Sequence, residues 1–124
     1  MEATLGKDHP DTLTSVNNLG DLLQDIGELA DAEPLYRRAL ESREAKLGKD
    51  HPETLKSVNN LGMLLQKMYR FEDAEPLYRR ALEGREAKLG KDHPSTLNSL
   101  NNLGMLLKKM GRLEDANKLL SRSS

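Results

Sequence analysis

Apolar residues recur every three or four positions along this chain, which is the spacing of one face of an α-helix. A first stripe is followed by a polar break and then by a second stripe with the same spacing. Strict alternation, the mark of a half-buried strand, is absent from both stripes. The pattern predicts two amphipathic helices of about 15–17 residues, roughly 25 Å long each. The stripes are Leu13, Val16, Leu19 and Leu23, then Ala32, Leu35, Tyr36, Ala39 and Leu40.

Proline and glycine mark where these helices are expected to begin and end. Pro10 is suited to a first helical turn, where a missing N–H removes no hydrogen bond, and Asp8 beside it can cap the helix or oppose its dipole. Gly27 is placed to end the first helix, and Gly48 to end the second after Lys46. Two helices joined by a short turn predict an antiparallel hairpin.

The hairpin is repeated along the chain. The string Leu-Gly-Lys-Asp-His-Pro recurs with a period of 42 residues, and ten of the 42 positions differ between the first two copies. Identical hairpins stack into a solenoid, so we expect one repeat domain over 1–124 with repeats at 5–46, 47–88 and 89–124. The last repeat is shortened, and Ser123 and Ser124 replace core residues there, which is typical of a capping repeat. Residues 2–5 are in phase with 44–47, which suggests a piece of a longer array.

The spacing of small and large residues resembles the tetratricopeptide repeat. The first repeat matches its signature at Val16, Leu19, Gly20, Leu23, Ala32, Tyr36 and Ala39, and the second at the positions 42 residues later. Armadillo and HEAT repeats have a similar period, but the Leu-Gly, Ala, Tyr, Ala pattern favours the tetratricopeptide repeat. The long repeat looks like the kinesin light chain type. The resemblance implies an all-α, right-handed solenoid of helix-turn-helix units whose first helices line an inner groove.

Composition excludes several classes of function. Nineteen Lys and Arg against twenty Asp and Glu give a net charge of −1, so no overall field attracts nucleic acid or an anionic membrane. The chain has no cysteine, hence no disulfide and no thiolate site, which agrees with a cytoplasmic location. No apolar run is long enough for a transmembrane helix or a signal peptide.

Catalytic and metal chemistry find no support in the pattern. His9, His51 and His93 occur once per repeat, and helices of neighbouring repeats pack about 10 Å apart, too far for a shared metal ion. We interpret them as loop residues that help to start the next helix. A nucleophile elbow and a phosphate-binding glycine loop are both missing from the sequence. We therefore expect a non-enzymatic protein with no metal and no cofactor.

Arginines of the second helix alternate with glutamates at helical spacing. Arg37 and Arg38, with their copies Arg79 and Arg80, lie three or four residues from Glu33 or Glu41 or their copies, and Arg43 and Arg85 stand next to Glu44 and its copy. This arrangement is typical of a solvated, salt-bridged face. We prefer that interpretation to a phosphate-binding site.

Paired asparagines in the middle of each first helix are the candidate binding feature. Asn is a mediocre helix former, so Asn17-Asn18, Asn59-Asn60 and Asn101-Asn102 need a reason. One explanation is that one amide of each pair bonds the neighbouring repeat. The other is a ladder of amides that holds the backbone of an extended peptide, since an amide both donates and accepts.

The residues that share the helix face with these amides differ between repeats. They are Thr14, Asp21 and Asp25 in the first repeat, Lys56, Met63 and Lys67 in the second, and Asn98, Met105 and Lys109, flanked by Lys108, in the third. The face thus changes from acidic to basic, with adaptable Met side chains between. The predicted peptide-binding residues are Asn17, Asp21, Lys56, Asn59, Asn60, Met63, Lys67, Asn98, Asn101, Met105, Lys108 and Lys109.

The sequence therefore predicts a protein-interaction module that binds an extended peptide with acidic and apolar residues. The alternative is a structural spacer or self-associating array without a peptide ligand. Because the first hairpin lacks the helix that would precede it, Leu13, Val16 and their neighbours are expected to form an apolar edge that supports a homodimer or end-to-end association.

One turn residue leaves two possibilities open. Tyr69 stands where the other repeats have Gly27 and Gly111. Either the turn keeps a left-handed backbone and the tyrosine is strained, at a cost of roughly 1 kcal/mol, or this turn is built differently.

Overall fold

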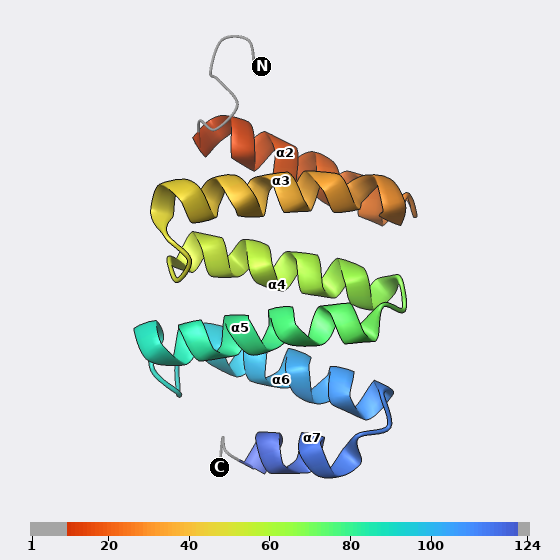
Figure 1. Cartoon of the computed structure of the whole chain (residues 1–124), viewed down its shortest axis with the longest axis vertical. Coiled ribbons are helices and arrows are strands. Elements are labelled where there is room, and N and C mark those ends of the chain that lie inside the picture. Colours follow the sequence, from red (N-terminus) through yellow and green to blue (C-terminus); the bar gives the residue numbers. More distant parts are fainter. Residues whose placement is uncertain (1–9, 122–124) are drawn as a thin grey trace.

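Three antiparallel helical hairpins stack on one another to form the molecule. The computed structural model describes residues 10–121, with side chains described from residue 15. Hairpin turns lie along one side of the stack, and the loops that join successive hairpins lie along the opposite side (Figure 1). The predicted α-solenoid of helix-turn-helix repeats is confirmed. Its helices are α2 (Pro10–Asp25), α3 (Leu29–Leu47), α4 (Pro52–Lys67), α5 (Phe71–Leu89), α6 (Pro94–Lys109) and α7 (Leu113–Leu120).

Histidines cap the first helices of the second and third hairpins. The Nδ1 atom of His51 accepts a hydrogen bond from the backbone N–H of Glu53 at 3.1 Å, and His93 accepts from Ser95 at 3.0 Å. This confirms that these two histidines help to start a helix, whereas His9 and Asp8 lie outside the described residues. Because proline occupies the first turn, the cap position falls on the histidine directly before it. The capping atom is therefore not supplied by the aspartates that precede His51 and His93.

Small residues let the two helices of each hairpin approach closely. A Cβ atom at Gly62 would lie 3.0 Å from the ring of Tyr78, and one at Gly20 would lie 3.1 Å from the ring of Tyr36. Both rings are buried. Burial raises the pKa of Tyr78 to about 12, so its hydroxyl stays protonated and donates to Oε1 of Gln66 at 2.9 Å.

Buried arginines connect each hairpin to the next. Nη1 of Arg43 donates to Oγ of Ser57 at 2.6 Å, and Nη1 of Arg85 donates to Oγ of Ser99 at 2.8 Å. Both arginine side chains are buried, and burial lowers the pKa of Arg85. The interpretation of these two arginines as part of a solvated face is therefore wrong. They lie on the face of the second helix that the next hairpin covers, so they bond across the junction.

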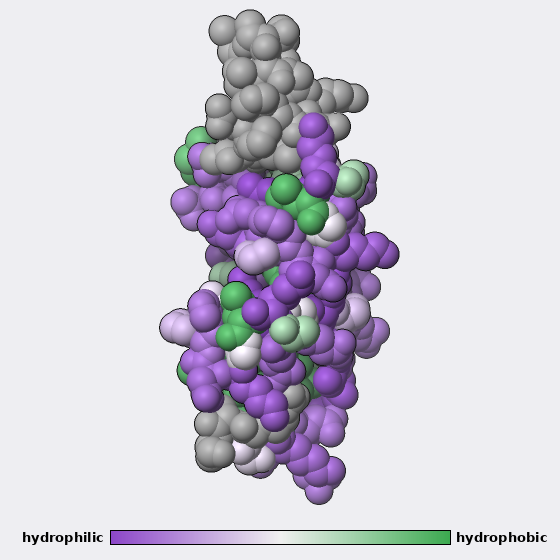
Figure 2. Space-filling view, turned by 90° about the vertical axis from the view of Figure 1, so that its left-hand side faces the viewer, coloured by the Kyte–Doolittle hydropathy of each residue, from purple (hydrophilic) through white to green (hydrophobic). Residues whose placement is uncertain are grey.

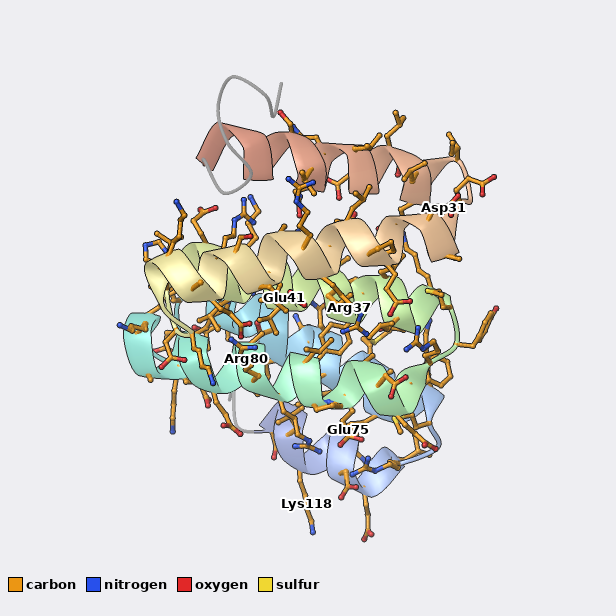
Figure 3. All side chains as sticks on the ribbon, turned by 45° about the horizontal axis from the view of Figure 1, so that its top comes forward. Asp31, Arg37, Glu41, Glu75, Arg80 and Lys118 are labelled. Carbon is orange, nitrogen blue, oxygen red and sulfur yellow. The ribbon has the colours of Figure 1, made fainter. Side chains whose placement is uncertain are left out.

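Of the other predicted arginines, Arg37, Arg79 and Arg80 form ion pairs on the side of the second helices, as predicted. Glu33 bonds Arg37 at 2.9 Å within α3 and Arg70 of the next hairpin at 2.7 Å. The copies of these residues repeat the arrangement around Glu75, with Arg79 at 2.9 Å and Arg112 at 2.6 Å. Figure 3 shows this charged side, with Arg37 and Glu41 on α3, Arg80 and Glu75 on α5, and Lys118 on α7. Each glutamate thus connects two neighbouring repeats.

The turn between α4 and α5 keeps the left-handed backbone of its counterparts. Tyr69 has φ 62°, compared with 88° at Gly27 and 79° at Gly111. Of the two possibilities for this turn, the structure shows the strained one. The side chain is 83% exposed, so little packing offsets the strain.

The variant Tyr69→Gly should be more stable than the parent protein. A left-handed backbone costs a non-glycine residue roughly 1–2 kcal/mol, and part of this gain is lost to the extra freedom of glycine in the unfolded chain. We expect a net rise of about 0.5–1 kcal/mol in the free energy of unfolding, measured by urea denaturation. A lower stability would show that the exposed tyrosine contributes more than its backbone costs.

Candidate functional site: a groove along the first helices

The residues that differ between repeats lie together on the exposed side of the first helices. On α4 they are Lys56, Met63 and Lys67, all exposed, with the half-buried Asn60 between them. Their spacing of three or four residues places them on one helix face. On α2 the exposed positions are Asp21 and Asp25, and on α6 they are Asn98, Asn101, Met105, Lys108 and Lys109. The side chain of Thr14 lies outside the described part of the structure.

An acidic pocket of about 150 Å³ lies between α2 and α4. Three predicted site residues meet there: Asp21, Asn60 and Met63. The hydroxyl of Tyr36 donates to Asp21 and, at 3.1 Å, to Gln24. Burial raises the pKa of Tyr36 well above its ordinary value, and the bond to Asp21 adds to this effect. The tyrosine therefore remains a donor that fixes one carboxylate of the pocket. The complete lining is Asp21, Gln24, Asp25, Tyr36, Asn60 and Met63.

A basic pocket of about 540 Å³ lies one junction further along the stack. It brings together two predicted residues, Lys67 at the end of α4 and Lys109 at the end of α6, and its other lining residues are Gln66, Tyr69 and Phe71. Negative side chains thus occur at one junction and positive side chains at the next. The remaining predicted residues Lys56, Asn98, Asn101, Met105 and Lys108 are exposed on α4 and α6, outside both pockets.

The asparagine pairs include a direct link between repeats. Nδ2 of Asn102 donates to Oδ1 of Asn59 at 3.1 Å, and Nδ2 of Asn59 faces the sulfur of Met63 at 3.5 Å. Asn59 is only 5% exposed. At this junction the structure therefore shows the first of the two explanations, an amide that bonds the neighbouring repeat.

The corresponding asparagine of the first repeat is placed differently. Asn17 is half-buried, and its Nδ2 donates to Asp21 at 3.5 Å. Its Oδ1 is buried and has no hydrogen-bond partner among the described residues, although the equivalent atom of Asn59 does. The amides of the groove therefore do not form a uniform ladder.

Several residues of this surface were not among the predicted site residues. Asn102 could have been found as the second member of its pair. Gln24 and Gln66 carry no signal in the sequence that separates them from other polar helix residues, because only the fold places them beside the turns. Phe71 looks like an ordinary core position, since the equivalent residues are leucines.

An apolar edge is exposed on α2, as expected, but Val16 does not belong to it. Val16 is buried, and the side chain of Leu13 lies outside the described residues. The exposed residues are Leu19, Leu22 and Ile26, which are 48%, 55% and 64% exposed. They lie three and four positions apart, on the helix face that a preceding hairpin would cover. The equivalents of Leu19 and Leu22, which are Leu61, Leu64, Leu103 and Leu106, are fully buried in the interior of the stack.

The side of the molecule that carries the loops between hairpins is mostly hydrophilic, with only scattered apolar residues among the described residues (Figure 2). Among residues 15–121, no group of three or more His, Asp or Glu side chains is arranged to hold a metal ion. Within the described part of the chain, no helix is long and apolar enough to cross a membrane.

Known proteins with the same architecture identify the family. The tetratricopeptide repeat profile matches residues 1–45, 16–87 and 53–124. The chain belongs to the tetratricopeptide repeat family, whose members are generally non-enzymatic scaffolds for protein interactions. Among curated protein sequences, none matches this chain closely enough to count as a relative.

Solved structures agree with the kinesin light chain type of repeat. BtubC (BKLC) from P. vanneervenii is 26% identical with a TM-score of 0.89, over 98% of this chain and 49% of that one. A Podosopora anserina protein assigned as a kinesin light chain, with nearly identical TPR-like repeats, is 26% identical with a TM-score of 0.90, over 98% of this chain and 58% of that one. The chain therefore spans about half the length of these proteins. The TPR domain of Arabidopsis FLU shares the fold, with 20% identity, a TM-score of 0.75 and 90% of each chain covered.

A double-mutant cycle should measure the link between Asn59 and Asn102. Asn102→Ala leaves the buried oxygen of Asn59 without a donor and should cost about 1–3 kcal/mol of unfolding free energy. The coupling energy between Asn59→Ala and Asn102→Ala should be about 0.5–1.5 kcal/mol, measured by urea denaturation. The matched control is a second cycle, between Asn59→Ala and Asn101→Ala, whose effects should add because Asn101 is exposed beside Asn102. Additive effects in the cycle of Asn59 with Asn102 as well would contradict the link.

Proposed function

We propose that this protein is a non-enzymatic interaction module that binds an extended peptide along the exposed side of α2, α4 and α6. The observation that carries the proposal is the clustering of the varying residues. In the second repeat only one of the ten positions that differ from the first repeat, Gly84, is buried, whereas Met63 and Lys67 and, in the first repeat, Asp21 are exposed. Residues that vary on one continuous face support selective recognition, since they leave the packing of the repeats unchanged. The fold agrees with this role.

The order of charges suggests the chemistry of the ligand. A peptide that crosses the first helices from one hairpin to the next passes the carboxylates of Asp21 and Asp25 at one junction. At the next junction it passes the ammonium groups of Lys67 and Lys109. Asp or Glu side chains are favoured near the lysines and are repelled near the aspartates. Met63 and Met105 are exposed, flexible and polarizable, and they suit an apolar or aromatic side chain.

The amides contribute unequally to this proposal. Asn60 lines the acidic pocket and Asn101 is exposed, so both are available to hold a peptide backbone. Asn59 and Asn17 are more enclosed, and in this proposal they support the groove from beneath. Lys56, Asn98 and Lys108 complete the exposed face as charged or polar contacts for the ligand.

We assign the module to the cytoplasm and expect a protein or peptide as its partner. The absence of cysteine agrees with a reducing compartment. The net charge of −1 gives no general attraction to nucleic acid or to an anionic membrane.

The second candidate function is self-association, alone or as a structural spacer. It is favoured by the apolar edge of Leu19, Leu22 and Ile26. In a second copy the same edge offers a matching surface, so two copies of α2 can cover each other as a homodimer. End-to-end stacking is the other arrangement that would cover this edge.

Peptide binding should follow the charges of the groove. A peptide with an acidic cluster beside one large apolar residue should bind with micromolar affinity and weaken as salt is added, because each exposed charge contact contributes about 0–1 kcal/mol. The double variant Lys67→Glu/Lys109→Glu should prefer a basic peptide instead, as measured by fluorescence polarisation. Lys46→Glu/Lys88→Glu is the matched control, since it makes the same change of net charge at the far ends of α3 and α5. Equal binding of the acidic peptide to all three proteins would exclude the groove as its site.

Self-association should depend on α2. In sedimentation velocity the protein should form dimers or longer assemblies as its concentration rises, because the apolar edge is removed from water on contact. Leu22→Asp should reduce this association, whereas Leu47→Asp, which changes an exposed leucine at the end of α3, should leave it unchanged. A protein that stays monomeric at millimolar concentration would refute this candidate.

A further inference from the structure

The basic pocket at the second junction has a composition that occurs at no other described junction. Lys67 and Lys109 line it from two neighbouring hairpins, and no carboxylate contributes to its lining. None of the ion pairs among the described residues involves either lysine. At the junction before it, Asp25 takes the position of Lys67, and Lys67 takes the position of Lys109. One carboxylate and one lysine therefore occupy these positions there. Two uncompensated positive charges therefore meet in this pocket only.

Two aromatic rings form the wall of the same pocket. The rings of Tyr69 and Phe71 are 6.0 Å apart between centroids and inclined at 61°. The equivalent residues are glycine and leucine in both other repeats, so this aromatic pair is confined to the second hairpin. On its other side the pair borders Glu72 and Asp73, of which Asp73 is bonded to Arg70 at 3.1 Å. The rings thus separate a basic pocket from an acidic surface.

The fold itself does not require the Tyr69 side chain. At the equivalent Gly27 and Gly111 an added Cβ would meet no atom within 4 Å, so no packing depends on a side chain there. Tyr69 nevertheless occupies a left-handed backbone and is mostly exposed. Strain of this kind that packing does not explain points to a role in binding.

We propose that this pocket binds a phosphotyrosine side chain of a partner protein. Phosphotyrosine combines an aromatic ring with a charge of about −1.5 to −2 at neutral pH. The ring packs against Tyr69 and Phe71, and the phosphate lies between the ammonium groups of Lys67 and Lys109. Glutamate and aspartate bring one charge and no ring, phosphoserine brings no ring, and unmodified tyrosine brings no charge. Phosphotyrosine is therefore the side chain that matches both parts of the lining.

Gln66 adds a polar contact to this pocket. Its Oε1 already accepts the hydroxyl of the buried Tyr78 at 2.9 Å, which leaves its NH₂ group to donate to a phosphate oxygen. The pocket shares its two lysines with the groove of the proposed function, but it does not need the asparagine amides or an extended peptide backbone.

The test compares three short peptides of the same sequence on the full chain by fluorescence polarisation. Their central residue is phosphotyrosine, tyrosine or phosphoserine. The phosphotyrosine peptide should bind about tenfold more tightly than either of the others, because only it can use both the lysines and the rings. Lys67→Gln/Lys109→Gln should abolish the preference for phosphotyrosine over tyrosine, and the control Lys46→Gln/Lys88→Gln should retain it.

Tyr69→Gly separates binding from folding. Because this variant is expected to be more stable than the parent, a loss of its preference for phosphotyrosine over phosphoserine cannot come from unfolding. The proposal is overturned if phosphoserine or tyrosine peptides bind as tightly as phosphotyrosine, or if Tyr69→Gly keeps the preference. An acidic, apolar peptide without phosphate is measured alongside. If the acidic, apolar peptide binds and the preference for phosphotyrosine is absent, only the phosphotyrosine proposal fails. If the preference is present and the acidic, apolar peptide does not bind, only the extended-peptide function fails.

Discussion

The guanidinium groups buried between hairpins determine how the repeats stack. A buried guanidinium that loses its acceptors is costly, so Arg43 and Arg85 favour the arrangement in which a serine hydroxyl of the next hairpin meets each of them. The carbonyl oxygen of Arg43 also accepts from Thr54 at 3.3 Å, which ties the same two helices a second time. This arrangement brings successive first helices into line. The convergence of Lys67 and Lys109 in one pocket depends on it.

Positions that are identical between repeats and positions that vary have different structural roles. The buried residues Tyr36 and Tyr78, and the glycines opposite them, are the same in the first two repeats and keep the hairpin geometry constant. Variation is concentrated at two places that packing leaves open: the exposed face of the first helices and the turn between α4 and α5. A repeat can therefore change its recognition properties without a change in its core.

Much of the fold was accessible from the sequence, because periodicity and helix-ending residues report on local structure. The helix limits at Pro52 and Gly48 and the close approach at Gly62 follow from such signals. The burial of Arg43 and Val16 did not, since a helical spacing shows which residues share a face but not which neighbour covers it. The same limit applies to the candidate site. The exposed face of the first helices with Met63 could be predicted. The hydrogen bond between Asn59 and Asn102 could not, because it depends on the distance between two hairpins.

At the junction between the second and third hairpins, the two sides are joined by bonds of a different kind. On the side of the second helices the link is ionic, through Arg112 and Glu75, whereas on the side of the first helices Asn59 and Asn102 join through neutral amides. Dissolved ions screen the first kind of link and leave the second unaffected. Added salt should therefore weaken the link on one side of this junction and leave the link on its other side in place.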